Sequence, residues 1–281
     1  MDKVCVGVFK CGNIGTAPIL ELLLDELADR KDIIVRTVTT GSKMDVEAIE
    51  NSIGKILEFN SDILLLISPN TSAPGPAKAR EILSKKELPT IILTDGPGRR
   101  VKAEIDEQGL GYMIIMGDPL IGARKEFLDP IEMAIFNANV IKVLACTGVF
   151  RLIFQEIDKL IYALKAESKL SLPKLVIDTD YIRKSQNFRN PYAMAKAMAA
   201  YELLKKAAEI NAKACFVEKD KGKYIPLVAC AHEIAQTSAE LADAAREIEK
   251  SSDKLLRTPH AKDGRLKIKE KLLSSPETPG K

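Results

Sequence analysis

The stretch KVCVGVFKCGNIGTAP, residues 3–18, has the pattern of a strand, a glycine-rich turn and the start of a helix. The apolar, β-branched run over residues 3–9 is typical of a strand. The turn fits the dinucleotide pattern G-x-G-x-x-G only in part, because the first glycine would have to stand at position 10, which is Lys10. Gly12 and Gly15 match. The missing glycine argues against a pyrophosphate lying on this turn.

Four further apolar runs follow at residues 32–38, 62–68, 90–95 and 111–117, with helical patterns between them. The run at 62–68 is apolar throughout, which suits a central strand buried on both faces. Alternating strands and helices predict an α/β fold with an open, mainly parallel, Rossmann-like sheet. Residues 172–182 are a candidate for a sixth strand that rejoins this sheet.

The second half of the chain has mostly helical patterns. Residues 129–167 begin with Asp129 and Pro130, a helix start signal, and Thr147-Gly148 marks a break. Two alanine-rich helices, starting at Asn190-Pro191 and covering 227–250, indicate a tight bundle or a subunit interface. Near the end, Asp263-Gly264 predicts a two-residue hairpin turn. We expect an α/β domain over 1–128, a helical bundle over 129–252 and a C-terminal β-hairpin segment over 253–281.

Composition excludes several classes of function. The net charge of +3 has no basic stripe, so we expect no nucleic-acid partner. The five cysteines form no C-x-x-C pair, which indicates reduced thiols in a cytoplasmic protein. The most apolar region, 131–154, is interrupted by polar residues, so we expect no membrane partner. Patterns of serine and zinc hydrolases and of P-loop proteins do not occur in the sequence.

The carboxyl ends of the predicted strands carry the candidate ligand site. Glycine and proline crowd the loops that follow the strands, and parallel sheets bind ligands at this edge. Lys10 and Lys43 favour an anionic ligand, and no acidic residue ends the second strand as it would in an NAD-binding protein. The alternative is that these glycines and prolines only terminate strands.

Four segments together carry a resemblance to a known family: residues 10–30, 68–76, 190–202 and 258–266. They resemble the coenzyme F420-dependent methylenetetrahydromethanopterin dehydrogenases of archaea, along nearly the whole chain. The resemblance implies a homohexamer that transfers a hydride reversibly between 5,10-methylenetetrahydromethanopterin and coenzyme F420 in one-carbon metabolism and methanogenesis. It implies F420 as a dissociable cosubstrate, with no prosthetic group and no metal. The first loop would then serve a deazaflavin with an anionic tail.

Position and chemistry select the residues for this reaction. Backbone N–H groups at the start of the first helix could hold a phosphate or ring carbonyl, and the third loop could contact a ring. The candidate cofactor-binding residues are Lys10, Gly12, Asn13, Ile14, Gly15, Thr16, Ser68, Pro69 and Asn70. A carboxylate would stabilise positive charge on the pterin. The candidate catalytic residues are Asp95, Asp118, Glu132 and His260. The aspartates could instead form turns, and Glu132 could simply complement a helix dipole.

Two other functions remain open from the residues alone. One is an NADP-dependent oxidoreductase with a degenerate fingerprint, against which Lys10 argues. The other is a non-catalytic oligomeric sensor that binds a nucleotide or pterin on the same loops. Reduction of F420 in the presence of the methylene-pterin separates the three.

Overall fold

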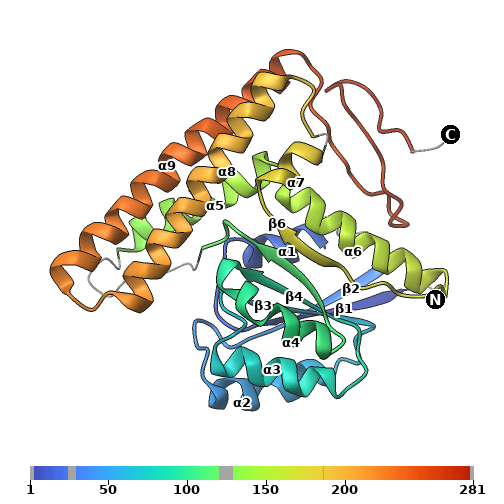
Figure 1. The fold of residues 1–281 in the computed structure, drawn as a ribbon. Coiled ribbons are helices and arrows are strands. Elements are labelled where there is room, and N and C mark those ends of the chain that lie inside the picture. Colours follow the sequence, from blue (N-terminus) through green and yellow to red (C-terminus); the bar gives the residue numbers. More distant parts are fainter. Residues whose placement is uncertain (1–2, 25–29, 120–128, 186, 279–281) are drawn as a thin grey trace. The chain divides into compact units, whose positions relative to one another are not determined.

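The computed structural model describes residues 3–24, 30–119, 129–185 and 187–278. Its sheet has six strands, all paired in parallel, in the order β2-β1-β3-β4-β5-β6 (Figure 1). The strands are β1 (Val4–Lys10), β2 (Ile33–Thr39), β3 (Ile63–Ser68), β4 (Thr90–Asp95), β5 (Gly111–Ile115) and β6 (Lys174–Ile177). The predicted α/β class and parallel sheet are therefore confirmed. The sixth strand is real but shorter than 172–182, because a helix begins at Thr179.

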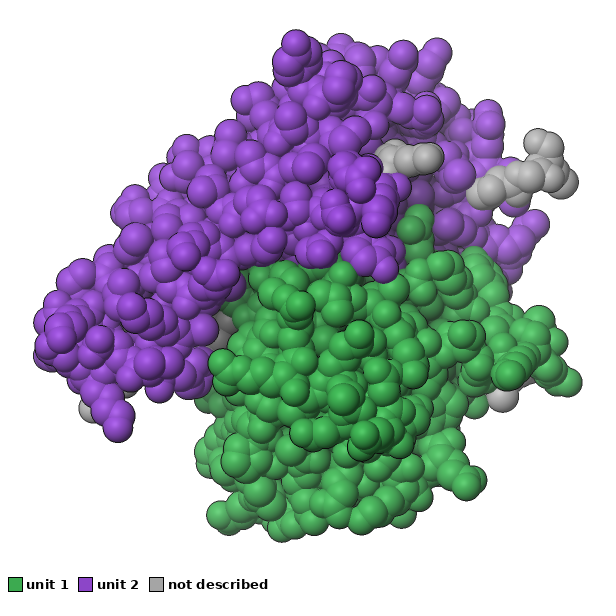
Figure 2. All heavy atoms as spheres, viewed as in Figure 1, with its two compact units in different colours: residues 1–26, 33–121, 153–177 green, residues 27–32, 122–152, 178–281 purple. Residues whose placement is uncertain are grey.

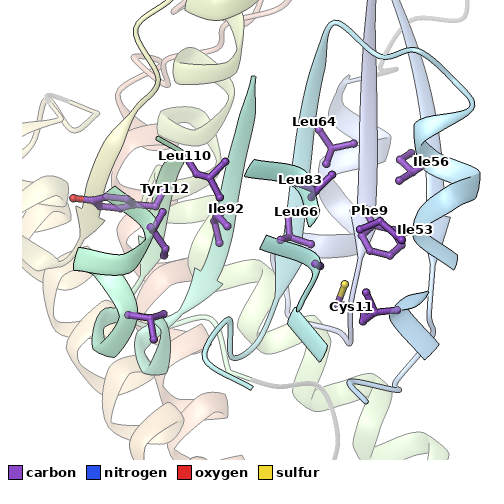
Figure 3. Packing of buried hydrophobic residues seen from close by; sticks show 14 of the residues in the cluster. Phe9, Cys11, Ile53, Ile56, Leu64, Leu66, Leu83, Ile92, Leu110 and Tyr112 are labelled. Carbon is purple, nitrogen blue, oxygen red and sulfur yellow. The ribbon is translucent and has the colours of Figure 1, made fainter. Parts of the chain in front are cut away.

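Helices cover both faces of this sheet (Figure 1). One face carries α2 (Val46–Leu57), α3 (Pro74–Ser84) and α4 (Lys102–Glu107), and the other carries α1 (Thr16–Leu24) and α6 (Val149–Lys165). A short 3-10 helix, η1 (Gly96–Val101), leads into α4. Figure 3 shows the core on the first face, where Ile53 and Ile56 of α2 and Leu83 of α3 pack over Phe9 and Leu66. The strands β3, β4 and β5 are buried along their whole length, which explains why apolar residues dominate them.

The order of the strands decides where a ligand site can form. Strand β2 lies on one side of β1, and the chain then crosses to β3 on the other side. This arrangement, 2-1-3-4-5, is one of the two common doubly wound orders. Its switch point lies between β1 and β3. In such sheets the loops at the carboxyl ends of the strands diverge at the switch point and leave a crevice for ligands.

The remaining helices are α5 (Pro130–Cys146), α7 (Thr179–Lys184), α8 (Pro191–Ala212) and α9 (Lys221–Ser251), with a π-helical turn η3 (Lys213–Val217) after α8. The predicted start signals are confirmed, since Asp129 and Asn190 cap α5 and α8. The predicted break is also correct: α5 and α6 meet at 65°, and Gly148 has a φ of +85° there. Helix α9 starts at Lys221, earlier than expected. Asp220 caps it, and Pro226 lies inside the helix, where it cannot donate to the carbonyl of Gly222.

Small side chains let α8 and α9 pack closely along one another (Figure 1). The hydroxyl of Ser238 on α9 donates to the carbonyl of Ala200 on α8 at 2.6 Å, which fixes the register of the pair. The alanines buried along the two helices are Ala193, Ala197, Ala200, Ala207, Ala208, Ala231, Ala235, Ala239, Ala242 and Ala245. The alanine-rich pattern thus forms a bundle within the chain.

The chain divides into two compact units (Figure 2). The first contains residues 1–26, 33–121 and 153–177, and the second contains 27–32, 122–152 and 178–281. These units are not the three consecutive segments that we expected from the sequence, because most of α6 and the strand β6 belong to the same unit as the rest of the sheet. The boundary expected at residue 128 lies outside the described residues.

The C-terminal segment pairs with itself through isolated antiparallel bridges, Arg257 with Lys269 and His260 with Leu266. The turn differs from the prediction. Ala261 N donates to Arg265 O at 2.9 Å, which leaves a three-residue loop that ends in Gly264 with a φ of +81°. A type I turn followed by a left-handed glycine is the usual three-residue hairpin loop. Asp263-Gly264 is therefore not a two-residue turn.

This hairpin packs against its own chain. The N–H of Lys31 donates to the carbonyl of Lys262 at 2.9 Å. A Cβ at Gly264 would overlap the carboxylate of Asp32, which is buried in an ion pair with Arg30 at 2.7 Å. The segment at 30–32 therefore supplies the packing that an isolated two-stranded hairpin lacks.

Within the described residues, no single helix has the length and apolar character to cross a membrane. The bent pair α5 and α6 meets that test only when the two helices are taken together.

Candidate functional site

The turn after β1 explains why no glycine is needed at position 10. The chain stays extended past Lys10, and Cys11 N donates to the carbonyl of Ile67 on β3 at 2.8 Å. The direction changes only at Gly12, whose φ of +84° favours glycine. A Cβ there would lie 3.0 Å from Met44 Sδ and 3.0 Å from Pro69 Cδ. Gly12 thus allows the first three strand-end loops to touch.

The second and third loops are held together at the same place. Gly75 N, at the start of α3, donates to the carbonyl of Met44 at 3.2 Å. A Cβ on Gly75 would overlap that carbonyl. Met44 therefore lies against both Gly12 and Gly75. The loops after β1, β2 and β3 form one packed surface at the switch point of the sheet.

Asp118, which follows β5, caps helix α1. Its two carboxylate oxygens accept from Thr16 N at 3.2 and 3.1 Å, and one also accepts from the Thr16 hydroxyl. Asp118 is fully buried. The N–H group of Thr16, which we expected to face a ligand, thus binds a carboxylate of the protein itself, as a helix N-terminus favours.

Asp95, at the end of β4, lies directly beside Asp118. Its Oδ1 accepts from Asp118 N at 3.2 Å. Burial, together with the charge of Asp95, raises the pKa of Asp118 to about 7, although the groups of Thr16 and Gly15 oppose the rise. Burial likewise raises the pKa of Asp95 to about 6, against the N–H groups of Gly96 and Asp118. Two adjacent buried carboxyls of this kind hold a proton near neutral pH.

The third loop is a network of local hydrogen bonds. Asn70 Oδ1 accepts from Ser72 N at 3.1 Å and from Ser72 Oγ at 2.5 Å, and Asn70 N donates to Ser68 Oγ at 3.3 Å. Asn70 therefore forms an Asx turn, and its side-chain amide N–H groups remain available. The next residue, Thr71, is completely buried, and within the described residues its hydroxyl has no partner. An orphaned buried hydroxyl is expected to have a partner, such as an ordered water or a group of a ligand.

The other candidates at the first loop differ in exposure. Asn13 is half-exposed, and its side chain has no hydrogen bond with any other described residue. Ile14 is fully buried, so only its backbone could face a ligand. The Lys10 carbonyl accepts from Thr40 N at 3.0 Å.

Glu132 and His260 belong to the second unit, each in its own surroundings. Glu132 Oε2 lies 3.6 Å from His232 Nδ1, and the His232 ring stacks on Phe136 with ring centroids 4.4 Å apart. Burial lowers the pKa of His232, whereas Glu132 opposes the change. His260 is buried in the C-terminal hairpin. The structure thus brings Asp95 and Asp118 together, in a unit different from that of Glu132 and His260.

Two residues of this surface carried little signal in the sequence. Met44 follows a polar turn, and Thr71 stands one position beyond the three third-loop residues that we selected. Only the serine, threonine and asparagine content of SPNTSAPGP could have indicated Thr71. Among the described residues, no group of three or more potential metal ligands occurs. A cavity of about 250 Å³ lies at the opposite, amino ends of β4 and β5 and is lined mainly by leucines, including Leu83, Leu88, Leu110 and Leu172.

Comparison with known proteins gives concordant results along the chain. A family model described as methylene-5,6,7,8-tetrahydromethanopterin dehydrogenase matches residues 4–277. The F420-dependent methylenetetrahydromethanopterin dehydrogenase of Methanothermobacter thermautotrophicus is 54% identical over 274 residues, which is 98% of this chain and 99% of that protein. The enzyme of the same name from Archaeoglobus fulgidus is 52% identical over 274 residues, with the same coverage.

A solved structure is similar over almost all of the chain. It has a TM-score of 0.94 and 49% identity, and the match covers 98% of this chain and 100% of the other. It is described as an F420-dependent methylene-tetrahydromethanopterin dehydrogenase in complex with methylene-tetrahydromethanopterin and coenzyme F420.

Proposed function

Because this chain belongs to the methylene-5,6,7,8-tetrahydromethanopterin dehydrogenase family, we propose that it transfers a hydride reversibly between 5,10-methylenetetrahydromethanopterin and coenzyme F420. The products are the 5,10-methenyl pterin and reduced F420. One observation carries the proposal: the full-length match, at 49% identity, to a protein solved with both of these molecules.

The two ligands supply the redox chemistry, since the pterin gives up a hydride and the deazaflavin accepts it. The chain must hold the two flat ring systems face to face at near-attack distance and exclude water. A rigid surface favours this task, and the contacts among Gly12, Met44 and Gly75 make the strand-end loops rigid. F420 then acts as a cosubstrate that binds and leaves in each turnover.

We assign ligand contacts to the first and third loops at the switch point. Among the described residues, the side chain of Asn13, the amide N–H groups of Asn70 and the buried hydroxyl of Thr71 have no hydrogen-bond partner. Gly12, Ser68 and Pro69 shape the surface around them. These features support Gly12, Asn13, Ser68, Pro69 and Asn70 of the candidate set, and we add Thr71 to it.

We assign Asp95 and Asp118 a positioning role, in which they do not touch the pterin. Both are buried, and the oxygens of Asp118 are engaged by Thr16. Their effect on catalysis would pass through the first loop, which Asp118 joins to the end of β5. Glu132 is the more accessible carboxylate and stays our candidate for stabilising positive charge on the pterin. His260 stays a candidate for handling a proton.

For the assembly we propose a homohexamer in the cytoplasm. Helix α5 has two large apolar side chains exposed, Ile131 and Ile135, and such exposed apolar groups favour a further packing partner. Tyr192 at the start of α8 is also exposed. All five cysteines are free thiols, which supports a reducing compartment.

The test is loss of the oxidised F420 absorbance when the purified protein is mixed with F420 and methylenetetrahydromethanopterin without oxygen. We expect turnover that requires the pterin and reverses when methenyl pterin and reduced F420 are supplied. NADP in place of F420 gives the second arm, and we expect no useful rate. Turnover with NADP at the same rate as with F420 would favour the alternative function, an NADP-dependent oxidoreductase. Saturable binding of F420 or pterin with no turnover in either arm would favour the non-catalytic sensor.

A further inference from the structure

Arg80 on α3 is a charged side chain that is buried in the first unit. It is 1% exposed. Its Nε donates to the carbonyl of Thr71 at 3.2 Å, its Nη1 donates to Gln108 Oε1 at 2.8 Å, and its Nη2 lies 3.1 Å from Glu104 Oε2. One guanidinium therefore joins the third strand-end loop to α4 and to the residue that ends it.

The position of Arg80 in its helix explains how the side chain reaches the loop. Helix α3 begins at Pro74, and side chains on a helix lean toward its N-terminus. Arg80 stands in the second turn, so its long side chain runs back along the helix toward the loop before Pro74. Helices α3 and α4 cover the same face of the sheet (Figure 1), which places acceptors from α4 beside the guanidinium.

The Thr71 carbonyl depends on this contact. Thr71 is completely buried, and within the described residues no backbone N–H donates to its carbonyl. Ala73 N, two residues further along, donates to the carbonyl of Asn70 instead, at 3.1 Å. Without Arg80 the Thr71 carbonyl would be buried without a partner, and only a movement of the loop toward water would satisfy it.

Stability alone is a weak explanation for the buried guanidinium. The side chain of its acidic partner Glu104 is 60% exposed, so water screens the ion pair. Burying a charge costs solvation, and an apolar side chain of similar volume often stabilises a fold as well as a buried ion pair does. The planar guanidinium instead holds three acceptors in fixed directions. The contacts of Arg80 therefore fix the geometry of the third loop.

We propose that Arg80 is a positioning residue for the proposed reaction and that it acts on F420 through Thr71. The Thr71 hydroxyl has no partner among the described residues and belongs to the residue whose carbonyl Arg80 holds. A fixed carbonyl orients this hydroxyl, together with the adjoining Asn70 amide, toward the ring of the cosubstrate. The inference rests on the proposed function, because it takes the third loop to contact F420.

Arg80→Met tests the inference, since methionine is unbranched and apolar and removes every donor. We expect the KM for F420 to rise at least about fivefold, as for one lost hydrogen bond, and the KM for the pterin to stay within about twofold. A loss of folded protein would lower the apparent kcat and change neither KM. The matched control is Lys78→Met, which removes a cation of the same helix that lies 3.4 Å from Glu81 and should change neither KM.

A double-mutant cycle decides whether the effect passes through Thr71. Thr71→Val removes the hydroxyl, keeps the shape of the side chain, and should raise the KM for F420 by a similar factor. The KM of the double variant, Arg80→Met with Thr71→Val, should be no higher than that of the worse single variant, because both changes remove the same contact. Effects that multiply in full would mean that Arg80 does not act through Thr71, which would overturn the inference.

Gln108→Ala keeps the inference testable if Arg80→Met does not fold. It leaves Arg80 in place and removes the acceptor of Nη1, so the KM for F420 should change in the same direction by a smaller factor. Hydrogen exchange measures the loop without turnover. The N–H of Ser72, which donates to Asn70 Oδ1 at 3.1 Å, should exchange faster in both variants, whereas the capped N–H of Ala48 on α2 should not change.

Two further results would overturn the inference and leave the proposed function intact. One is wild-type turnover together with an unchanged KM for F420 in Arg80→Met and Gln108→Ala. The other is exchange at the Ser72 N–H that neither variant alters. Failure of the proposed function has a different sign, since the wild type itself would then not reduce F420 with the pterin. The role in that reaction would fall with it, and hydrogen exchange would still decide whether Arg80 holds the third loop.

Discussion

The buried carboxyl of Asp118 should make the stability of the protein depend on pH in a defined direction. Its pKa is about 7 in the folded protein against an ordinary value of 3.8, because burial penalises the charged form. Folding therefore takes up a proton between about pH 4 and pH 7. Stability from this group is fully present below pH 3.8 and is lost as the pH rises through 7. Three pKa units correspond to about 4 kcal/mol.

Asp118→Asn isolates this contribution, because asparagine keeps one oxygen for Thr16 and cannot ionise. The free energy of unfolding of the variant, minus that of the wild type, should increase by about 4 kcal/mol between pH 4 and pH 8. Urea unfolding followed by circular dichroism, at one protomer concentration throughout, measures the difference. The contributions of the other titrating groups largely cancel in this difference of unfolding free energies. Asp95 is an exception, because Asp118→Asn removes the charge beside it.

A second variant tests the cause of the shift. The hydroxyl of Thr16 donates to Asp118 and thereby lowers the pKa of that carboxyl. Thr16→Val removes this hydroxyl, so the pKa of Asp118 should rise. We therefore expect Thr16→Val to lose the stability contributed by Asp118 at a higher pH than the wild type does. A difference curve for Asp118→Asn that stays flat within about 1 kcal/mol from pH 4 to pH 8 would refute the reasoning, since a flat curve requires equal proton uptake in both proteins.

Three further predictions concern glycines and a buried acid. Gly12→Ala places a methyl group 3.0 Å from Met44 Sδ and Pro69 Cδ at a φ of +84°, so the KM for F420 should rise while the oligomer stays intact by light scattering; an unchanged KM would make the loop purely structural. Gly264→Ala should destabilise the packing of the C-terminal hairpin, because a methyl group there would overlap Asp32, whereas Gly109→Ala is the control with a positive φ and no neighbour. Hydrogen exchange at the Lys31 N–H, which donates to Lys262, measures the loss of this packing. Equal protection of that N–H in both variants would contradict the prediction. Glu249→Ala removes the buried carboxylate that accepts from Arg189 N at 3.0 Å and Asn190 N at 2.8 Å, so the melting temperature should fall by several degrees for a loss of about 2–3 kcal/mol; a melting temperature unchanged within a degree would show that water replaces the cap.

Local patterns were sufficient for most of the fold. The five apolar runs became parallel strands, and Asp129 and Asn190 capped the helices that they were expected to start. The break at Thr147-Gly148 was also predicted. These features depend on neighbours within a few residues, such as a side chain that accepts from the next turn of the same helix. The length of an apolar run, by contrast, did not give the end of β6.

The contacts that build the site were beyond such patterns. Asp118 and Thr16 are 102 residues apart, and the sequence around each indicated only a turn and a helix start. The three-residue loop at Gly264 likewise depends on Asp32, which stands far away in the chain. The same sequence, Asp-Gly, fits a two-residue turn when nothing packs against it. Tertiary partners decided both cases.

The capping of α1 changes where an anionic ligand can be bound. A helix N-terminus after a glycine-rich turn is normally an anion site, and the sequence indicated one at residues 12–16. In the folded chain the carboxyl of Asp118 already meets Thr16 N, so a second negative group there would face a buried acid instead of free N–H donors. The first loop is therefore better suited to contact a neutral ring.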